Sequence, residues 1–265
     1  MSPKIIALLS DLGTRDYFVG AMKGTILSVD SKANIIDITH EVPKGDIQTA
    51  AFVLSQAAET FPSGSIFVVV VDPGVGTKRK CILLRTKNGL KFIGPDNGVF
   101  TLVAEKFGVS EIYEITNPAL MRTTISPTFH GRDIMAPVAA HLSAGVKPVE
   151  VGPLLKTFKR LKIPYARLTK GKIQGVILNV DHFGNVITNI ESSLISGFAE
   201  FGKKLNMKIE GRSLSLKFVR TFGDVETGAL LCYVGSAGFL ELARNRGNLA
   251  AELKVKVRAS ISVWK

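Results

Sequence analysis

The chain has few cysteines and no long apolar runs. Among its 265 residues only Cys81 and Cys232 are cysteines, too few and too far apart for a disulfide scaffold. We expect both to be reduced, core-facing thiols in a cytoplasmic protein. The longest apolar runs suffice only for strands, which predicts no membrane span and no membrane partner. Residues 1–4, followed by a short strand pattern, lack the small-residue cleavage site of a signal peptide.

Metal-binding and familiar catalytic motifs are also absent from the sequence. There is no histidine pair at helical ligand spacing, no paired-cysteine motif and no aspartate-rich calcium loop, so we expect no metal ion. No Gly-x-Ser-x-Gly motif marks a serine hydrolase. Residues 74–78 are glycine-rich but lack the spacing of a phosphate-binding loop.

Acidic residues are scarce in the second half of the chain. Residues 1–150 hold 15 basic and 14 acidic side chains, whereas residues 151–265 hold 19 basic and 8 acidic ones. A basic half could bind nucleic acid or an acidic partner. Aromatic residues are not interleaved with the basic ones, as a stacking platform for bases requires. We therefore interpret the excess as a solvated basic surface and expect no nucleic-acid partner.

The first part of the chain alternates apolar strands with amphipathic helices. This alternation predicts an α/β domain over residues 1–155, with a mostly parallel sheet and helices on both faces. The expected strands are 5–9, 34–38, 66–71, 81–84, 90–93 and 111–115, and the expected helices are 18–29, 47–61, 99–106 and 134–143.

The pattern changes after about residue 152. Residues 156–172 contain seven basic residues and no acidic one, and we interpret them as a basic linker. Short alternating strands follow, which predict a small antiparallel β-barrel or sandwich over residues 173–265. The expected strands are 174–180, 186–190, 208–209, 214–218, 229–234, 251–257 and 261–264.

Polar side chains follow several strands of the predicted sheet at the point where each strand ends. Asp72 comes directly after four consecutive valines and precedes Pro73, and Asp11 and Asn97 follow two other strands. Ligands of α/β sheets bind at the carboxyl ends of the strands. The alternative for Asp72 is an ordinary turn cap, since Asp often precedes Pro-Gly.

His130 lies in a loop before the last helix of the predicted α/β domain. Such a histidine is more often structural, but this loop belongs to the presumed ligand edge, which also carries Asp72 and Arg79. A histidine beside a carboxylate and an arginine can orient and deprotonate a water molecule. The remaining histidines lie in turns or in mid-helix and are weaker candidates.

Two polar loops of the second part contain the other candidate residues. Residues 181–185 separate two strands, and a hairpin turn is the simplest interpretation of them. Residues 235–239 form a second loop, with Glu241 and Arg244 close behind. The Asn185 amide, the Ser236 hydroxyl and two aromatic rings could form a slot for a planar base. Those rings belong to Phe183 and Phe239.

Taken together, these motifs resemble the S-adenosyl-L-methionine (SAM) hydroxide adenosyltransferase family, relatives of the fluorinase and chlorinase. The resemblance extends over nearly the whole chain in order, and several ordered motifs are more specific than any one of them. The motifs are SDLGT at 10–14, VDPGVGT at 71–77, GPDNG at 94–98, FHGRD at 129–133, DHFGN at 181–185 and GSAGFLELARNRGN at 235–248.

The resemblance implies a fold, an activity and an assembly. The fold is an N-terminal α/β domain followed by a C-terminal β-barrel. The activity is hydrolysis of SAM to adenosine and L-methionine by water attack on the ribose C5′, with no cofactor or metal beyond the substrate. The assembly is a homotrimer whose sites lie where one subunit's first domain meets a neighbour's second domain.

The resemblance also implies roles for individual residues. Asp72, Arg79 and His130 would form a water-activating triad, in which Asp72 and Arg79 fit positioning roles and His130 fits a base or proton relay, and Asp11 would hold the ribose hydroxyls. The remaining substrate-binding residues would be Asn97, Asp181, Phe183, Asn185, Ser236, Phe239, Glu241 and Arg244, together with Asp72 itself.

Two alternative functions follow from the same residues. One is a halide-using adenosyltransferase. Halogenating relatives carry a hydroxyl-bearing residue near the position of Gly131 and an extra loop, whereas this chain has glycine there and no long insert. Phe239 also stands where many members have tyrosine, so no hydroxyl is expected there. The other alternative is a non-catalytic binder of adenosine-type ligands or RNA, suggested by the basic second half.

Overall fold

The computed structural model describes residues 5–265, and residues 1–4, where we looked for a signal peptide, lie outside it. Its contacts divide the chain into two compact units, Met1–Leu161 and Lys162–Lys265. Within the described residues no helix is long and apolar enough to cross a membrane. The boundary falls inside the stretch 156–172 that the sequence suggests as a linker, and a short strand, β7 (Arg167–Thr169), also lies in that stretch.

The first unit is built on one mixed sheet. Strand β1 pairs in parallel with β2 and β3, and β3 pairs in parallel with β5. Strand β4 is antiparallel to β5, because the Lys87-Asn88-Gly89 turn returns the chain directly as a hairpin, and it is also antiparallel to β6. The strands, in the spatial order β2-β1-β3-β5-β4-β6, are β1 (Ile5–Ser10), β2 (Asn34–Thr39), β3 (Ile66–Val70), β4 (Cys81–Thr86), β5 (Lys91–Pro95) and β6 (Val109–Glu114).

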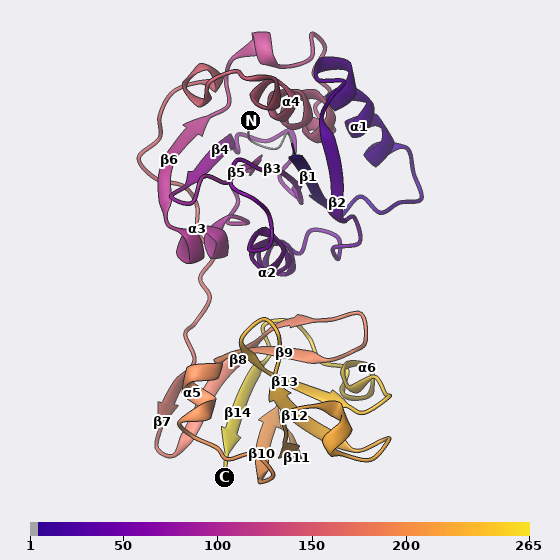
Figure 1. Ribbon diagram of the computed structural model, residues 1–265, viewed down its shortest axis with the longest axis vertical. Coiled ribbons are helices and arrows are strands. Elements are labelled where there is room, and N and C mark those ends of the chain that lie inside the picture. The colour runs from indigo at the N-terminus through magenta and orange to yellow at the C-terminus, as the bar shows by residue number, and fades with distance from the viewer. Residues whose placement is uncertain (1–4) are drawn as a thin grey trace. The chain divides into compact units, whose positions relative to one another are not determined.

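Helices cover both faces of this sheet, as Figure 1 shows. Helices α1 (Phe18–Val29) and α4 (Ala136–Ala144) bury one core, and α2 (Ile47–Ala58) and α3 (Thr101–Phe107) bury the other. Alternate residues of β3 supply the two cores, so the strand is buried on both faces, as its run of valines predicts. The predicted α/β architecture is therefore confirmed.

Local signals explain where two of the helices start and stop. The Asp46 carboxylate accepts hydrogen bonds from the backbone N–H groups of Gln48 and Thr49, which caps α2. Helix α4 ends at Gly145, which adopts the left-handed conformation at φ 115°. The predicted helix over 134–143 begins earlier than expected, because a single π-helical turn, Gly131–Met135, precedes α4. Short 3₁₀ turns occupy Pro118–Leu120, Pro148–Val151 and Phe222–Asp224.

The second unit is a closed β-barrel around its own apolar core. Its sheet order is β14-β10-β11-β12-β13-β9-β8, and β14 pairs again with β8 to close the barrel. Neighbouring strands are antiparallel except β11 and β12, which are parallel. The strands are β8 (Lys172–Val180), β9 (Val186–Glu191), β10 (Lys204–Ile209), β11 (Arg212–Phe218), β12 (Leu230–Val234), β13 (Phe239–Arg244) and β14 (Ser260–Trp264), with β7 on the outer side of β8.

One strand prediction in this unit is wrong. Residues 251–257 alternate like a strand, but the chain forms helix α6 (Leu249–Leu253) there. The Asn248 side chain accepts a hydrogen bond from the backbone N–H of Ala251 at 2.8 Å, and this cap starts the helix. The sequence patterns also missed α5 (Ser192–Ser196), β7 and β13.

Candidate active site

Three of the predicted site residues lie at one edge of the first unit's sheet. Asp11, Asp72 and Asn97 follow β1, β3 and β5, which are parallel neighbours. Hydrogen bonds tie these strand ends together. The backbone N–H of Asp11 donates to the Val70 carbonyl at 3.4 Å, and the Asn97 side-chain amide donates to the Val71 carbonyl at 2.9 Å. The carboxyl edge of the sheet therefore gathers them, as expected for an α/β ligand site.

The Arg79 guanidinium lies at the centre of a buried polar cluster. Its Nε donates to both Asp72 carboxylate oxygens, at 3.0 and 2.8 Å. Its Nη2 lies 2.5 Å from Asp72 Oδ2 and 2.7 Å from the Nδ1 atom of His130. The Arg79 and Asp72 side chains are only 7% and 6% exposed. Burial opposes the charge of Arg79, but the hydrogen bond that Arg79 donates to Asp72 and the negative charge of Asp72 act the other way, and the pKa of the guanidinium is raised.

This geometry determines where His130 carries its proton. Arginine only donates hydrogen bonds, so Nδ1 of His130 must be the acceptor. Burial and then the charge of Arg79 lower the pKa of His130 below its ordinary value of 6.5, which favours the neutral ring. The neutral ring then carries its hydrogen on Nε2, so the side chain presents a donor there.

A buried carboxylate fixes the loop that carries His130. Asp133 is fully buried and accepts from Arg132 at 2.7 Å and from the backbone N–H of Ser126 at 2.8 Å. Gly131 lies against β3, where an added Cβ would approach Val70 Cγ1 to 2.9 Å. Glycine is therefore required for this close packing. The π-helical turn that starts here is a feature often found at functional sites.

Asp11 and Asn97 are held by backbone groups at the same edge. Oδ2 of Asp11 accepts from the N–H of Gly45 at 2.8 Å, so one carboxylate oxygen is already oriented. The Asn97 amide bonds at both ends, because its oxygen also accepts from the Val99 N–H at 3.2 Å. Asn97 therefore fastens the end of β5 to the Asp72 loop.

The barrel holds a second buried carboxyl group. Glu241 of β13 lies directly opposite Tyr233 of β12, and the tyrosine hydroxyl donates to Oε2 of Glu241 at 2.6 Å. Burial raises the pKa of Glu241, and the nearby charge of Asp181 raises it further. Burial and Glu241 also raise the pKa of Tyr233. An added Cβ at Gly235 would overlap the Glu241 carboxylate, so glycine makes room for it.

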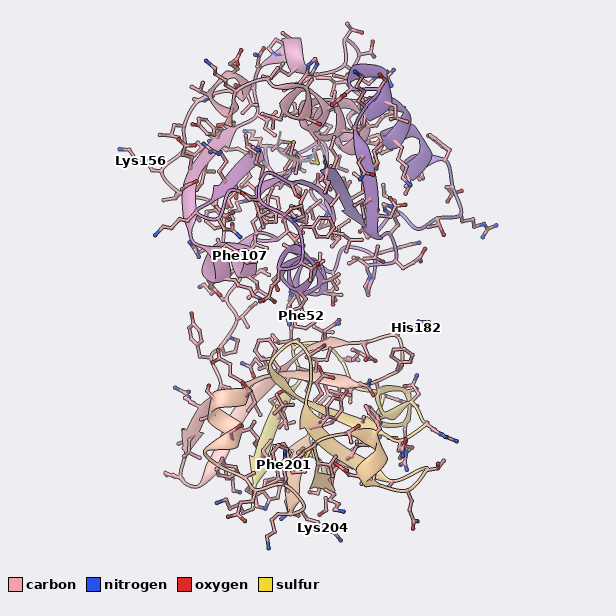
Figure 2. All side chains as sticks on the ribbon, viewed as in Figure 1. Phe52, Phe107, Lys156, His182, Phe201 and Lys204 are labelled. Atoms are coloured by element: carbon pink, nitrogen blue, oxygen red, sulfur yellow. The ribbon has the colours of Figure 1, made fainter. Side chains whose placement is uncertain are left out.

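The loop between β8 and β9 presents an aromatic ring beside a fixed amide. Asp181 accepts from the backbone N–H and the side-chain amide of Asn185, both at 2.8 Å. Phe183 is 73% exposed at the tip of the loop. Its ring lies 5.8 Å from that of His182, which Figure 2 labels.

The remaining barrel candidates, Ser236, Phe239 and Arg244, differ in exposure and in their contacts. Ser236 is exposed in the turn after β12, and Phe239 is half-buried at the start of β13. Arg244 donates to both Glu252 oxygens at 2.7 Å, an ion pair within the barrel. Contact of these three residues with a substrate stays a prediction.

Two family models match this chain in sequence. The SAM hydroxide adenosyltransferase N-terminal domain matches residues 6–152, and the C-terminal domain of the same family matches residues 175–262. The chain belongs to the SAM hydroxide adenosyltransferase family. The resemblance inferred from the motifs is therefore confirmed.

Individual relatives align with this chain over nearly their whole length. A protein named (R)-S-adenosyl-L-methionine hydrolase, from Salinispora tropica, is 39% identical and covers 94% of each chain. A protein named fluorinase, from an Actinoplanes species, is 31% identical over 98% of this chain and 97% of its own. The crystal structure of an uncharacterized conserved protein from Thermotoga maritima matches with a TM-score of 0.94 and 42% identity. It covers 98% of this chain and 100% of that one.

Two residues that contact site residues were not predicted from the sequence as part of the site. Cys81 contacts Arg79, with 3.0 Å from Nη1 to Sγ, and Tyr233 contacts Glu241. Cys81 lies two residues after Arg79, where an extended chain repeats the same side, so the spacing was available as a signal. Tyr233 depends on the pairing of β12 with β13, and β13 was not predicted.

Proposed function

We propose that the protein hydrolyses SAM to adenosine and L-methionine by attack of water on the ribose C5′. The observation that carries this proposal is the buried Asp72–Arg79–His130 cluster at the carboxyl edge of the sheet. Membership of the SAM hydroxide adenosyltransferase family and the relatives named SAM hydrolase support the same reaction. The leaving group is a neutral thioether, so the reaction needs an activated nucleophile rather than an acid.

In this proposal, one residue of the cluster donates a hydrogen bond to the attacking water and another accepts a proton from it. The neutral His130 donates from Nε2 and orients the attacking water, while Asp72 is the carboxylate that accepts a proton. The water oxygen forms a bond to C5′ as the bond from C5′ to sulfur breaks, and that electron pair leaves with methionine. The water becomes strongly acidic as it bonds to carbon, so a carboxylate is a sufficient base. Arg79 holds both partners in place.

The binding residues complete the proposal. We assign Asp11 to the ribose hydroxyls, because its carboxylate is fixed beside Asp72 at the strand ends. We assign the barrel candidates to the adenine and methionine parts of the substrate, since an exposed ring and a fixed amide suit a planar base. The set comprises Asp181, Phe183, Asn185, Ser236, Phe239, Glu241 and Arg244. Asn97 acts in this scheme by holding the Asp72 loop.

A halide-using reaction is the competing function, because fluorinases are among the relatives. A hydroxyl-bearing side chain at position 131 would have to displace Val70 of β3. The packing at Gly131 therefore favours water over halide as the nucleophile.

The decisive experiment is incubation of the pure protein with SAM in heavy-oxygen water, with and without chloride. Adenosine carrying the heavy oxygen at its 5′ position would support the proposal. A 5′-halogenated nucleoside would replace it with the halide reaction. Unconsumed SAM together with tight adenosine binding would leave a non-catalytic binder.

The oligomeric state, the independence from metal and cofactor, and the cellular location stay predictions. A homotrimer is expected, and the mass in solution, measured by light scattering, tests it. Independence from metal and cofactor is expected, and full activity after dialysis against a chelator tests it. In residues 5–265 no three His, Cys, Asp or Glu side chains gather as metal ligands. A cytoplasmic location is expected, and cell fractionation tests it.

A further inference from the structure

We propose that Cys81 is a positioning residue. Its thiol sulfur accepts a hydrogen bond from Nη1 of Arg79 and thereby keeps the guanidinium in the orientation that contacts Asp72 and His130. This proposal rests on the proposed hydrolysis, which gives the cluster its task. Nothing in the sequence motifs assigns a role to this cysteine.

The contacts of Arg79 show what the sulfur contributes. Asp72 binds Nε and Nη2, and His130 binds Nη2, so neither of them is a partner of Nη1. Cys81 Sγ, at 3.0 Å, is the partner of Nη1. Without it, Nη1 would face the apolar core to which Cys81 belongs, together with Tyr113 and Ile115. An unpaired buried donor is costly, so Arg79 would turn to recover a partner.

The position of Cys81 is rigid, which suits a positioning role. It is the first residue of β4 and is 6% exposed. Its carbonyl accepts from the N–H of Ile115 at 2.9 Å, and β4 pairs with β5 from this residue onward. The sulfur is therefore held by the sheet rather than by the loop that carries Arg79.

The chemistry of the thiol also fits. Burial, only partly offset by the charge of Arg79, raises the pKa of Cys81 to about 11, so the group stays a neutral thiol at physiological pH. A neutral acceptor satisfies Nη1 without a second negative charge that would compete with Asp72 for the arginine. A neutral buried thiol is also a poor nucleophile, which excludes a covalent role.

The test compares Cys81→Ala and Cys81→Ser with Cys232→Ala. Cys232 is a matched control, since it is equally a buried cysteine but lies in the barrel, where its sulfur contacts the Lys217 carbonyl. We expect Cys81→Ala to lower kcat about tenfold with KM unchanged, because small misplacement of a catalytic group slows only the chemical step. Cys81→Ser should keep kcat within about threefold of the wild type, since its hydroxyl also accepts from arginine. Cys232→Ala should retain wild-type kcat.

A second measurement does not depend on activity. The pKa of His130, followed by nuclear magnetic resonance, is lowered by burial and Arg79, while Asp72 and Asp133 oppose the shift. In Cys81→Ala a displaced Arg79 should let this pKa rise, whereas Cys232→Ala should leave it unchanged. Wild-type kcat and an unshifted His130 in Cys81→Ala would overturn the proposal and leave Cys81 a core residue. If the wild type does not consume SAM, the proposed hydrolysis fails, and the His130 titration still decides whether Cys81 positions Arg79.

Discussion

Each unit of the chain holds a buried carboxylate among the residues predicted to contact the substrate, Asp72 in the first unit and Glu241 in the barrel, and these two lie in opposite surroundings. The side chain of Asp72 in the first unit is 6% exposed, and Glu241 in the barrel is 6% exposed as a whole residue. Asp72 is paired with the cation Arg79, whereas Glu241 contacts the hydroxyl of Tyr233 and lies near the acid Asp181. The first unit thus pairs its carboxylate with a cation, whereas burial and Asp181 raise the pKa of the carboxyl group in the barrel despite the hydrogen bond from Tyr233.

Under the proposed hydrolysis, this contrast assigns the chemical step to the first unit and substrate binding to the barrel. A preorganised charge in a buried site stabilises the developing charge of a transition state without reorganisation. Burial and Asp181 raise the pKa of Glu241, and a carboxyl group that takes up a proton can donate as well as accept, which suits binding of a polar ligand. Variants of the first unit should therefore affect kcat most, and barrel variants should affect binding or stability.

The largest effect is expected from Arg79→Lys. An ammonium group cannot reach Asp72, His130 and Cys81 together, as the planar guanidinium does. We expect kcat to fall about 10³-fold, at the upper end for loss of one preorganised donor. The matched control is Arg85→Lys on β4, whose arginine pairs with Glu111 away from the cluster. A kcat within tenfold of wild type in Arg79→Lys would show that the charge alone suffices.

A smaller effect, and a graded one, is expected at His130. His130→Ala should lower kcat about 10²-fold, at the lower end of the usual cost of losing a proton-handling group. His130→Gln should retain more activity, because an amide can both accept from Arg79 and donate to water, as the neutral ring does. Equal loss in both variants would identify His130 as the base instead. His141→Gln in α4 is the control.

The same inference predicts the acid limb of the pH profile. The pKa of His130 is lowered below 6.5 by burial and by Arg79, so the active neutral ring is lost only as pH falls through that lower value. Activity in the wild type should therefore be level at neutral pH and decline below it. This limb should be absent from the profile of His130→Gln.

Much of the first unit was predictable because local pattern and tertiary packing agree there. The helix over 18–29 matched α1 to the residue, and the valine run gave β3. The shared edge of Asp11, Asp72 and Asn97 followed from parallel strands alone. The association of Arg79 with His130 was expected only from the place of the His130 loop at this edge and from the family resemblance, because those residues are 51 positions apart and no local pattern connects them.

The barrel was less predictable because some of its segments carry sequence patterns of both strands and helices. The alternation of residues 251–257 resembles a strand, and the Asn248 cap, which decides for a helix, lies outside that window. Strand β13 was hidden by the glycines and polar residues around it, so the pairing of Tyr233 with Glu241 was not anticipated. A barrel strand is defined by its neighbours, which a single sequence shows poorly.

A moderate effect, on binding rather than rate, is expected from Asp11→Asn. The carboxylate accepts from the Gly45 N–H, and an amide placed there would present a donor toward the ribose hydroxyls as readily as an acceptor. We expect KM and the adenosine Kd to rise about tenfold, the usual cost of one charged hydrogen bond, with kcat changed little. Asp16→Asn, on the exposed loop after Asp11, is the control for calorimetry. An unchanged adenosine Kd would remove the ribose role of Asp11.

The smallest effect, measured as the stability of the ligand-free protein, is expected from Glu241→Gln. The pKa of Glu241 is raised above 4.5 in the folded state, so the folded chain holds this proton more tightly than the unfolded chain. The stabilisation is complete below pH 4.5 and is lost as pH rises through the folded-state pKa. Glutamine has no proton to lose, so the Tm of the variant should gain on the wild type from acid to neutral pH.

Glu252→Gln supplies a control of opposite sign in the same barrel. The hydrogen bond from Arg244 lowers the pKa of Glu252, so its contribution is present at neutral pH and lost in acid. Glu252→Gln should therefore lose Tm at neutral pH and approach the wild type in acid. If Glu241→Gln followed this same trend, Glu241 would be a stabilised anion like Glu252. The contrast between the two units would then fail, because both buried carboxylates would be held as charges.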